Sequence, residues 1–391
     1  MRILFLSGEY PPQPGGVGDY THRLAAALRE RGYSGGVLTI QAGRVILYDL
    51  PQIRDTRSTG DNKIVMSGTR GNLDWSWRSW PAVFSALEQQ RPDWLHIQYQ
   101  TGAYAMHPAI NLLPRRLRRL PNRPRVAVTF HDLLVPYLFP RAGPLRRWTN
   151  LALARSADAL ICTNAADAAQ LRAAGMHPTQ IPIGANIAPI PPPEYDRDAW
   201  RAQLGVGEHE LLVAYFGLLA ANKGVDLVLD ALQQFSRPWR LLLIGGAATA
   251  PQDIAYGAAL RNRIGQQGLV ERVISTGHVA PEQVSAHLLA ADLVTLPFRD
   301  GASLRRGSLL AALAHGCPLI TTQPQDPEAA ALIRDECEAL LTAVSAPAIT
   351  AALERLADDT ALRNQLAAGG KVLAARFTWP AIATAHEACY R

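Results

Sequence analysis

The chain alternates short apolar runs with amphipathic helical stretches, and it does so in two successive series. The first series opens with RILFLS at residues 2–7 and the second with ELLVAYFG at residues 210–217. Strands that are apolar almost throughout and alternate with helices are typical of a parallel sheet covered on both faces. We therefore predict an α/β fold of two Rossmann-like, doubly wound domains that face a central cleft. Ligands of such sheets bind at the carboxyl ends of the strands.

A proline-rich segment separates the two series. The sequence IAPIPPPEY at residues 187–195 has neither a helical nor a strand pattern, so we interpret it as a semi-rigid linker. The last sixteen residues, RFTWPAIATAHEACYR, predict a helix with Pro380 in its first turn. The expected division is a domain at 1–190, a domain at 191–370, and a terminal helix within 371–391 that packs back on the first domain.

The composition favours a globular protein without a membrane span. Of the 391 residues 48% are hydrophobic and 18% charged, which is enough for two buried cores. No apolar run reaches the roughly 18 residues that span a bilayer, and the opening MRILFLSGEY lacks a signal-peptide cleavage pattern. The cysteines have no metal-ligand or redox spacing, which is typical of free buried thiols in a reducing compartment. We expect a cytoplasmic protein. The four cysteines are Cys162, Cys317, Cys337 and Cys389.

Positive charge is concentrated in the first half of the chain. Six arginines lie between Arg115 and Arg125, and Arg141, Arg146 and Arg147 precede Trp148. A solvated surface would explain them, and so would peripheral contact with the anionic inner face of a membrane, where each cation contributes about 1 kcal/mol. We expect no nucleic-acid partner, because few aromatic residues accompany the arginines and no nucleic-acid-binding motif is present.

Two strand ends of the first domain carry candidate site residues. The loop YPPQPGGVGDY contains Gly15, Gly16 and Gly18, which would let the backbone approach an anion at a helix start. A tight turn would also explain glycines here, and their spacing differs from the dinucleotide fingerprint G-x-G-x-x-G. The run VTFHDLL places His131 and Asp132 directly after a strand, where either a structural or a catalytic histidine would fit.

Further candidates lie elsewhere along the two series. We interpret His96, inside the buried run WLHIQY, as a core residue with a hydrogen-bonded ring. Lys223 stands at a helix start, where a cation can meet phosphate, although a solvated lysine would look the same. Gly245 and Gly246 end the strand LLLIGG and suit the close approach of a flat ring.

These motifs together resemble, in order, those of the retaining GT-B glycosyltransferases of family four. The matching stretches are the glycine loop, FHD, IPIGANI, GLLAANKG, LIGG, TGHV, AADLVTLPF, LAHGCPLI and FTWPAIA. The resemblance covers nearly the whole chain. It implies a two-domain, metal-independent enzyme without a cofactor, whose C-terminal domain binds a nucleotide-sugar donor as co-substrate. The N-terminal domain would present the acceptor, a hydroxyl of a saccharide or a lipid-linked molecule.

The resemblance also implies roles for individual residues. Gly15, Gly16 and Gly18 match the loop near the donor phosphates and the acceptor. His131 matches a histidine that contacts the donor sugar, and Lys223 matches a phosphate-binding lysine.

Three positions depart from the family pattern. Leu218 stands where the family usually has an arginine, and Ser303 and Ala311 stand where it usually has two glutamates, one at the sugar and one at the ribose. The way in which the donor is bound should therefore differ. This leaves two alternatives to transfer, namely a non-catalytic sugar-nucleotide-binding relative and a sugar-nucleotide epimerase on the same fold.

The loop that lacks the first glutamate contains two adjacent arginines. Arg305 and Arg306 precede a helix that we expect to start near Ser308 and to stop at Gly316. Free N–H groups at that helix start favour an anion, and the hydroxyls of Ser303 and Ser308 add donors. Adjacent side chains point in different directions, so we expect one arginine to bind donor phosphate and the other to brace the loop through a carboxylate such as Asp300. Two solvated arginines are the alternative.

Overall fold

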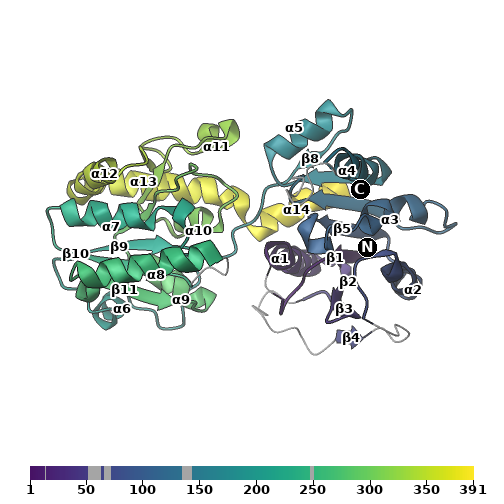
Figure 1. Cartoon of the computed structure of the whole chain (residues 1–391), viewed down its shortest axis with the longest axis horizontal. Coiled ribbons are helices and arrows are strands. Elements are labelled where there is room, and N and C mark those ends of the chain that lie inside the picture. The colour runs from purple at the N-terminus through teal and green to yellow at the C-terminus, as the bar shows by residue number, and fades with distance from the viewer. Residues whose placement is uncertain (14, 52–62, 66–71, 134–142, 247–250) are drawn as a thin grey trace. The chain divides into compact units, whose positions relative to one another are not determined.

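The computed structural model describes residues 1–13, 15–51, 63–65, 72–133, 143–246 and 251–391 (Figure 1). They form two units, one made of Met1–Gly184 with Trp379–Arg391 and the other of Ala185–Thr378. The division thus falls a few residues away from the expected boundaries at 190 and 370. The reason is local packing: the Ala185 N–H donates to the Phe377 carbonyl at 2.9 Å, and the Phe377 side chain is buried in the core of the second unit.

The first unit contains an eight-stranded sheet in the order β4-β3-β2-β1-β5-β6-β7-β8. Six strands are mutually parallel, as predicted, but β2–β3 and β3–β4 pair antiparallel. Only Ala42 and Gly43, both with positive φ, connect β2 to β3. A connection of two residues permits only a hairpin, which explains the antiparallel edge. The strands are β1 (Arg2–Ser7), β2 (Ser34–Gln41), β3 (Arg44–Asp49), β4 (Lys63–Val65), β5 (Trp94–Tyr99), β6 (Arg125–Phe130), β7 (Ala159–Cys162) and β8 (Thr179–Gln180).

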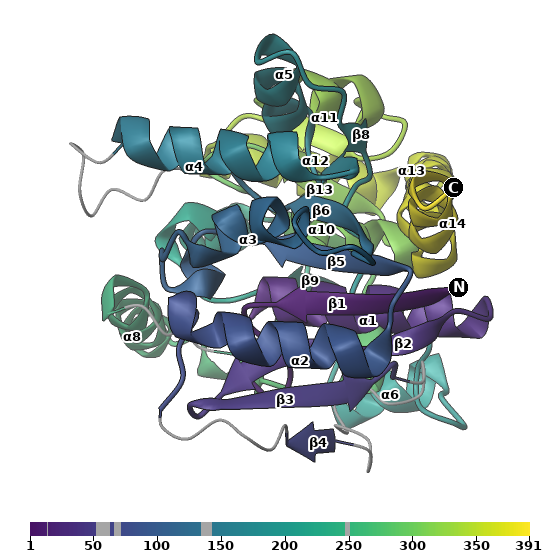
Figure 2. The ribbon, with the colours of Figure 1, turned by 90° about the vertical axis from the view of Figure 1, so that its right-hand side faces the viewer.

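Helices cover both faces of this sheet (Figure 2). Alternate residues of β1 point to opposite faces, so Leu4 and Leu6 join one core while Ile3 and Phe5 join the other. The terminal helix α14 packs against α1 in the second of these cores, which contains Ile382. The helices are α1 (Gly16–Glu30), α2 (Trp80–Gln90), α3 (Ala109–Leu117), α4 (Gly143–Ser156), α5 (Ala165–Ala173) and α14 (Trp379–Cys389).

The second unit contains a six-stranded parallel sheet in the order β11-β10-β9-β12-β13-β14. The strand order reverses at β9, which pairs with β10 on one side and β12 on the other. Such a switch point is where open α/β sheets bind ligands, at the carboxyl ends of the strands. The strands are β9 (Leu211–Phe216), β10 (Trp239–Ile244), β11 (Val273–Gly277), β12 (Leu293–Leu296), β13 (Leu319–Thr322) and β14 (Leu340–Thr342).

The helices of the second unit follow these strands in alternation, and α13 packs against α10. The short helix after the double arginine begins at Gly307 and ends at His315, with Gly316 in the left-handed conformation at its carboxyl cap, close to the predicted bounds. The helices are α6 (Arg197–Gln203), α7 (Val225–Gln234), α8 (Pro251–Gln266), α9 (Pro281–Ala290), α10 (Gly307–His315), α11 (Pro327–Leu332), α12 (Ala346–Asp358) and α13 (Thr360–Ala374).

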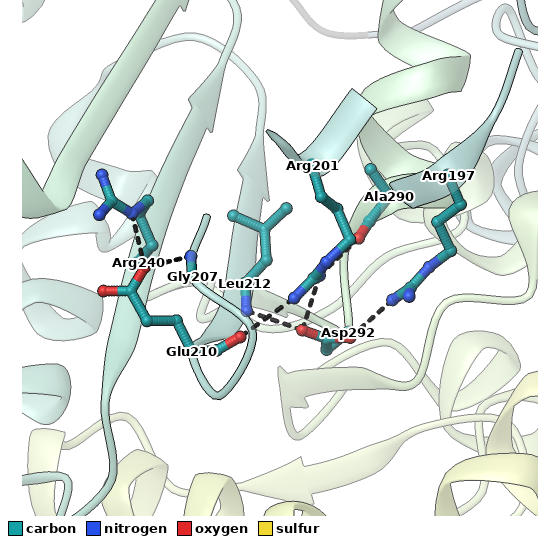
Figure 3. Close-up of polar contacts among 8 residues, drawn as sticks. All are labelled: Arg197, Arg201, Gly207, Glu210, Leu212, Arg240, Ala290 and Asp292. Atoms are coloured by element: carbon teal, nitrogen blue, oxygen red, sulfur yellow. Dashed lines mark hydrogen bonds and ion pairs between the residues drawn. The ribbon is translucent and has the colours of Figure 1, made fainter. Parts of the chain in front are cut away.

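An ion-pair network occupies the amino ends of β9 and β12 (Figure 3). The Asp292 carboxylate accepts hydrogen bonds from Arg197 at 2.6 Å, from Arg201 at 2.9 Å and from the Leu212 N–H at 2.8 Å. Arg201 also donates to the Glu210 carbonyl at 3.0 Å, so α6 is tied to two neighbouring strands. Because each charge in this network has a partner within the unit, we assign the network a structural role.

His96 and the cysteines differ in how far they are buried. His96 is fully buried, with Nδ1 2.6 Å from the Tyr390 hydroxyl and Nε2 2.8 Å from the Thr129 hydroxyl, which confirms a hydrogen-bonded core residue. All four cysteines are free, but only Cys162 and Cys317 are buried, while the other two are half-buried. Burial raises the pKa of both buried thiols to about 12, so neither forms a thiolate at neutral pH.

Candidate functional site

In the second unit, the chain segments that leave β9 and β10 touch backbone to backbone. Gly217 follows β9, and Gly245 follows β10 with φ +126°. A Cβ atom on Gly245 would lie 2.4 Å from the Gly217 carbonyl oxygen, so only glycine allows this approach. Ser308, in the first turn of α10, lies beside Gly217: a Cβ atom on Gly217 would be 3.9 Å from the Ser308 Oγ. Gly246 lies next to His278 beyond β11.

The 3₁₀ turn that carries Lys223 is attached to the loop after β12. A Cβ on Gly224, where φ is +72°, would lie 2.3 Å from the Pro297 carbonyl oxygen. The Arg299 N–H donates to the Asn222 carbonyl at 3.0 Å, and the Arg299 Nε donates to the Ala221 carbonyl at 3.1 Å. These contacts bring Lys223 to the residues that follow β12.

Two cationic side chains lie near the ring of Phe298, which follows β12. The Lys223 Nζ lies 5.4 Å from the centroid of the Phe298 ring, and the Arg306 guanidinium carbon lies 4.1 Å from it. Burial lowers the pKa of Lys223, and the nearby Arg306 charge lowers it further, because both disfavour the ammonium form. An anion bound between the two groups would relieve their repulsion.

Arg306 makes the brace that we expected from one arginine of the pair. Its Nη2 lies 2.5 Å from the Asp300 Oδ1, and its side chain is 13% exposed. The Arg306 N–H also donates to the Ser303 carbonyl at 3.0 Å, and the Ser303 hydroxyl accepts from the Arg305 N–H at 3.3 Å. The side chain of Arg305 is exposed. The loop is therefore a closed turn, with Arg306 directed inward over Phe298.

Helix α10 starts immediately after this turn without a side-chain cap. Arg306 is the N-cap residue, and among the described residues no side chain bonds to the N–H groups of the first turn from that position. Uncapped N–H groups and the helix dipole favour an anion at this end. Ala311, one turn further on, is fully buried in the core.

In the first unit, His131 lies at the end of a chain of buried hydrogen bonds. Its Nε2 is 2.9 Å from the Gln98 Oε1, and the Gln98 Nε2 is 3.2 Å from the His96 Nε2. Burial lowers the pKa of His96 well below its usual range, so this ring is neutral, and its Nε2 accepts from the Gln98 amide nitrogen, which can only donate. The Gln98 amide oxygen can only accept, and His131 therefore carries a proton on Nε2. The rings of His131 and Tyr20 form a T-shaped pair, with their centroids 4.7 Å apart.

The neighbouring carboxylate has a different partner. The Asp132 Oδ2 accepts from the Gln100 Nε2 at 2.8 Å, so Asp132 is held toward the segment after β5. The two candidate residues of this strand end are thus each positioned by a glutamine of the adjacent strand or its exit.

The start of α1 differs from the expected anion site. The Glu9 Oε1 accepts from the Val17 N–H at 3.0 Å, so a carboxylate of the chain itself lies at the helix start. A Cβ on Gly15 would lie 2.2 Å from the Glu9 carboxyl carbon, and one on Gly18 would lie 3.0 Å from the Tyr10 Cα. These two glycines serve internal packing. A Cβ on Gly16, in contrast, would meet no atom within 4 Å among the described residues, so this backbone is open to a ligand.

Three residues at these edges were absent from our sequence-based candidates. Gln98 had a signal, since it is a polar residue near the end of an otherwise apolar strand. Phe298 had none, because a phenylalanine after a strand is typical of a core. Glu9 follows the first strand directly, but its carboxylate reaches the helix start only through the fold of the intervening loop.

Two family models match the chain. The model described as glycosyl transferase 4-like domain matches residues 15–184, and the model described as glycosyl transferases group 1 matches residues 210–359. They correspond to the two units of the structure and together match most of the chain.

Curated relatives match about half of the chain. A D-inositol 3-phosphate glycosyltransferase from Xylanimonas cellulosilytica is 26% identical over 209 residues, which are 53% of this chain and 48% of the relative. The lipopolysaccharide core biosynthesis mannosyltransferase LpsB from Rhizobium meliloti is 29% identical over 204 residues, 50% of this chain and 55% of the relative. The chain thus spans about half the length of the curated relatives that it matches.

Solved structures match the fold over the whole chain. Sucrose-phosphate synthase from Thermosynechococcus elongatus has a TM-score of 0.72 at 21% identity, covering 100% of this chain and 98% of the other. Anabaena HepE in complex with UDP-glucose has a TM-score of 0.69 at 20% identity, covering 99% of each chain. The first unit thus matches the glycosyl transferase 4-like domain and the second matches the glycosyl transferases group 1, and the chain has the two-domain GT-B fold of the solved structures.

Proposed function

We propose that this protein is a glycosyltransferase that moves a sugar from a nucleotide-sugar donor to a hydroxyl of a saccharide or lipid-linked acceptor, with retention. The observation that carries the proposal is the meeting of Lys223, Arg306 and the uncapped start of α10 at the switch point of the second sheet. A diphosphate fits this set of groups. The named activities of the matched relatives, and the UDP-glucose bound to HepE, support the same class of donor.

The donor would be held by the second unit and the acceptor by the first. We assign the diphosphate to the cations and donors of the β12–α10 loop and its neighbours, and the nucleoside to the glycine edge of β10. His131 would contact the sugar, with Asp132 and the open backbone of Gly16 nearby. The proposed donor-binding residues are Gly245, Gly246, Lys223, Ser303, Arg305, Arg306 and Ser308.

The proposed transfer breaks one bond at the anomeric carbon and forms another, while negative charge develops on the leaving diphosphate. The bond between the anomeric carbon and the phosphate oxygen breaks, and its electron pair leaves with the diphosphate. The acceptor oxygen forms the new bond to the same carbon and gives its proton to the departing phosphate oxygen. Fixed cations aimed at the leaving oxygens stabilise the charge that develops there, which is the largest single effect in many enzymes.

The absence of both family glutamates keeps a non-catalytic sugar-nucleotide binder and an epimerase as rivals. Titration of a panel of nucleoside diphosphates by calorimetry, followed by assays of donor hydrolysis and epimerisation, separates the three. Transfer predicts nucleotide binding with slow release of free sugar from the donor. Binding without sugar release would support the first rival, and a change of sugar configuration without release would support the second.

Activity is expected to survive removal of divalent cations. Among the described residues, no group of three or more His, Cys, Asp or Glu side chains could hold a metal ion. We propose that Lys223, arginines and backbone N–H groups meet the phosphate charge instead, and that no cofactor is needed. Initial rates with and without excess EDTA test this. Loss of activity with EDTA that Mg²⁺ or Mn²⁺ restores would contradict it.

We further propose a cytoplasmic protein that contacts the anionic face of a membrane peripherally. Within the described residues no helix is long and apolar enough to cross a bilayer. Not all arginines of the basic segment are available for such a contact: Arg123 pairs with Asp158 at 2.6 Å, and Arg125 lies over the Trp94 ring at 4.4 Å. Arg141 lies outside the described residues. The other four arginines between Arg115 and Arg125 are exposed, namely Arg115, Arg116, Arg118 and Arg119.

These four arginines are expected to give salt-sensitive binding to vesicles. At ~0.15 M salt the Debye length is about 8 Å, so only cations close to the surface contribute. Sedimentation with vesicles that contain phosphatidylglycerol should show binding that weakens as salt rises, and that weakens in an Arg115→Glu, Arg119→Glu variant. Arg237→Glu, an exposed arginine of the second unit, is the control. Equal binding to neutral vesicles would contradict the prediction.

A further inference from the structure

We propose that a pocket between α3, α4 and the segment after β5 binds the hydrocarbon chain of an anionic amphiphile, whose phosphate meets the arginines at its rim. The inference rests on the proposed function, because the amphiphile would be the lipid-linked acceptor. It assigns the acceptor to the lipid class and gives its chain a defined place in the first unit.

The pocket has a volume of about 230 Å³ and a predominantly apolar lining. Met106 and Leu112, both half-buried, contribute to its walls. Leu145 and Trp148 also line it, and they are unusually exposed for large apolar side chains, at 63% and 49%. They lie three residues apart on α4 and thus on one helix face. Apolar groups left in water at a cavity favour an apolar ligand.

Polar groups at the bottom of the pocket already have partners. The Tyr99 hydroxyl donates to the Asn150 Oδ1 at 2.8 Å and accepts from the Asn111 Nδ2 at 2.8 Å. The Asn111 Nδ2 also lies 3.1 Å from the Asn150 Oδ1. The Tyr99 hydroxyl, the Asn111 Nδ2 and the Asn150 Oδ1 thus pair with one another, so a hydrocarbon chain can lie over these three atoms without breaking their hydrogen bonds.

Positive charge predominates around the pocket, although Asp132 and Asp158 directly follow the two arginine-containing stretches. Residues 101–131 and 143–157 contain nine arginines and neither Asp nor Glu. Arg146 lines the pocket itself, and Arg147 next to it is exposed. At the other end of the helix pair, the Arg118 Nη2 donates to the Arg155 carbonyl at 3.1 Å, which joins α3 to α4 (Figure 2). An apolar pocket with cations at its rim is complementary to a chain that ends in phosphate, and not to a neutral sugar.

The test uses decyl phosphate below its micelle concentration, titrated into the full-length protein by calorimetry without any donor. Inorganic phosphate and decyl maltoside are the comparison ligands, the first without a chain and the second without a charge. We expect one decyl phosphate per chain, bound about tenfold or more tightly than either comparison ligand, because chain and phosphate both contribute.

Three variants locate the binding. Leu112→Trp fills the pocket, Arg146→Ala removes the rim cation, and Trp148→Ala removes an exposed part of the lining without disturbing the core. Each should weaken decyl phosphate binding, while Val65→Ala, which trims an apolar side chain of similar exposure (47%) on the edge strand β4, should not. If Leu112→Trp fails to fold, Trp148→Ala still tests whether the pocket binds the chain, because Trp148 lies outside the core.

Equal binding of inorganic phosphate and decyl phosphate would overturn the proposal, and so would binding that none of the three variants weakens. No binding of decyl phosphate would overturn it as well. Failure of this proposal and failure of the proposed function are distinguishable: if decyl phosphate binds in the pocket while the protein transfers no sugar, glycosyl transfer is wrong and the amphiphile site stands.

Discussion

Replacement of His131 by alanine is expected to lower kcat by about 100-fold or more, the scale of a positioned catalytic group, while nucleotide affinity changes little. We place the imidazole at the sugar, whereas the nucleotide would be held by the second unit. The proton on Nε2 is directed to Gln98, and this contact fixes the ring orientation. Steady-state kinetics give kcat, and calorimetric titration gives the nucleotide affinity.

His131 is only 6% exposed, so its replacement also lowers stability. A matched control separates this effect from a loss of catalysis. His287 is buried to a similar extent, at 7%, and its Nδ1 accepts one hydrogen bond from Trp200 at 3.0 Å. Alanine at either position leaves a buried partner unpaired, which lowers stability by about 1–3 kcal/mol. The His287→Ala variant should therefore lose stability but keep kcat. If both variants lose activity in proportion to their stability, His131 is a structural residue.

Gln98→Leu extends this test to the positioning of the ring. Leucine removes the acceptor for the Nε2 proton, so the imidazole loses its fixed orientation although it is still present. We expect kcat to fall and KM for the donor to change little. The nitrogen chemical shifts of His131 should also show a mixture of tautomers, a readout that loss of packing alone would not produce. A single unchanged tautomer in Gln98→Leu would contradict the assignment.

Alanine at Arg305 or Arg306 is expected to reduce kcat/KM by about 10²–10³ at one position at least, because a cation aimed at developing charge is worth that much. The two substitutions should differ in kind. Arg306 braces the loop through Asp300 and lies over Phe298, so Arg306→Ala should also lower the melting temperature. Arg305 is exposed, so Arg305→Ala should affect the rate with an unchanged melting temperature.

Two further variants control for charge alone. Arg306→Lys keeps the positive charge but loses the planar guanidinium that lies over the Phe298 ring and pairs with Asp300, so it should recover little of the lost activity. Arg237→Ala removes a surface arginine paired with Asp358 and should leave kcat/KM unchanged. Normal folding of both alanine variants with parental kcat/KM would show that neither arginine replaces the cation missing at Leu218.

The local predictions from sequence held where a short stretch determines its own structure. The strand runs, the bounds of α10 and the position of Pro380 in the terminal helix depend on periodicity and on residues at helix ends, which a single segment contains. The two-residue connection Ala42–Gly43 is equally local, and a connection this short is itself a sequence signal for an antiparallel hairpin.

What the sequence by itself determined was the class of fold, the positions of most strand ends, and therefore which residues could reach a carboxyl edge. Only the tertiary structure decided which of those residues meet. Phe298 under two cations, Asp300 on Arg306 and Gln98 on His131 join residues from different elements, and no periodicity encodes such pairs. Glu9 at the start of α1 is the clearest case, since the sequence showed a helix start open to any anion and the fold supplied one from the chain itself. Each of these contacts depends on the direction of a side chain after the backbone has turned, and that direction is set by packing against segments distant in sequence.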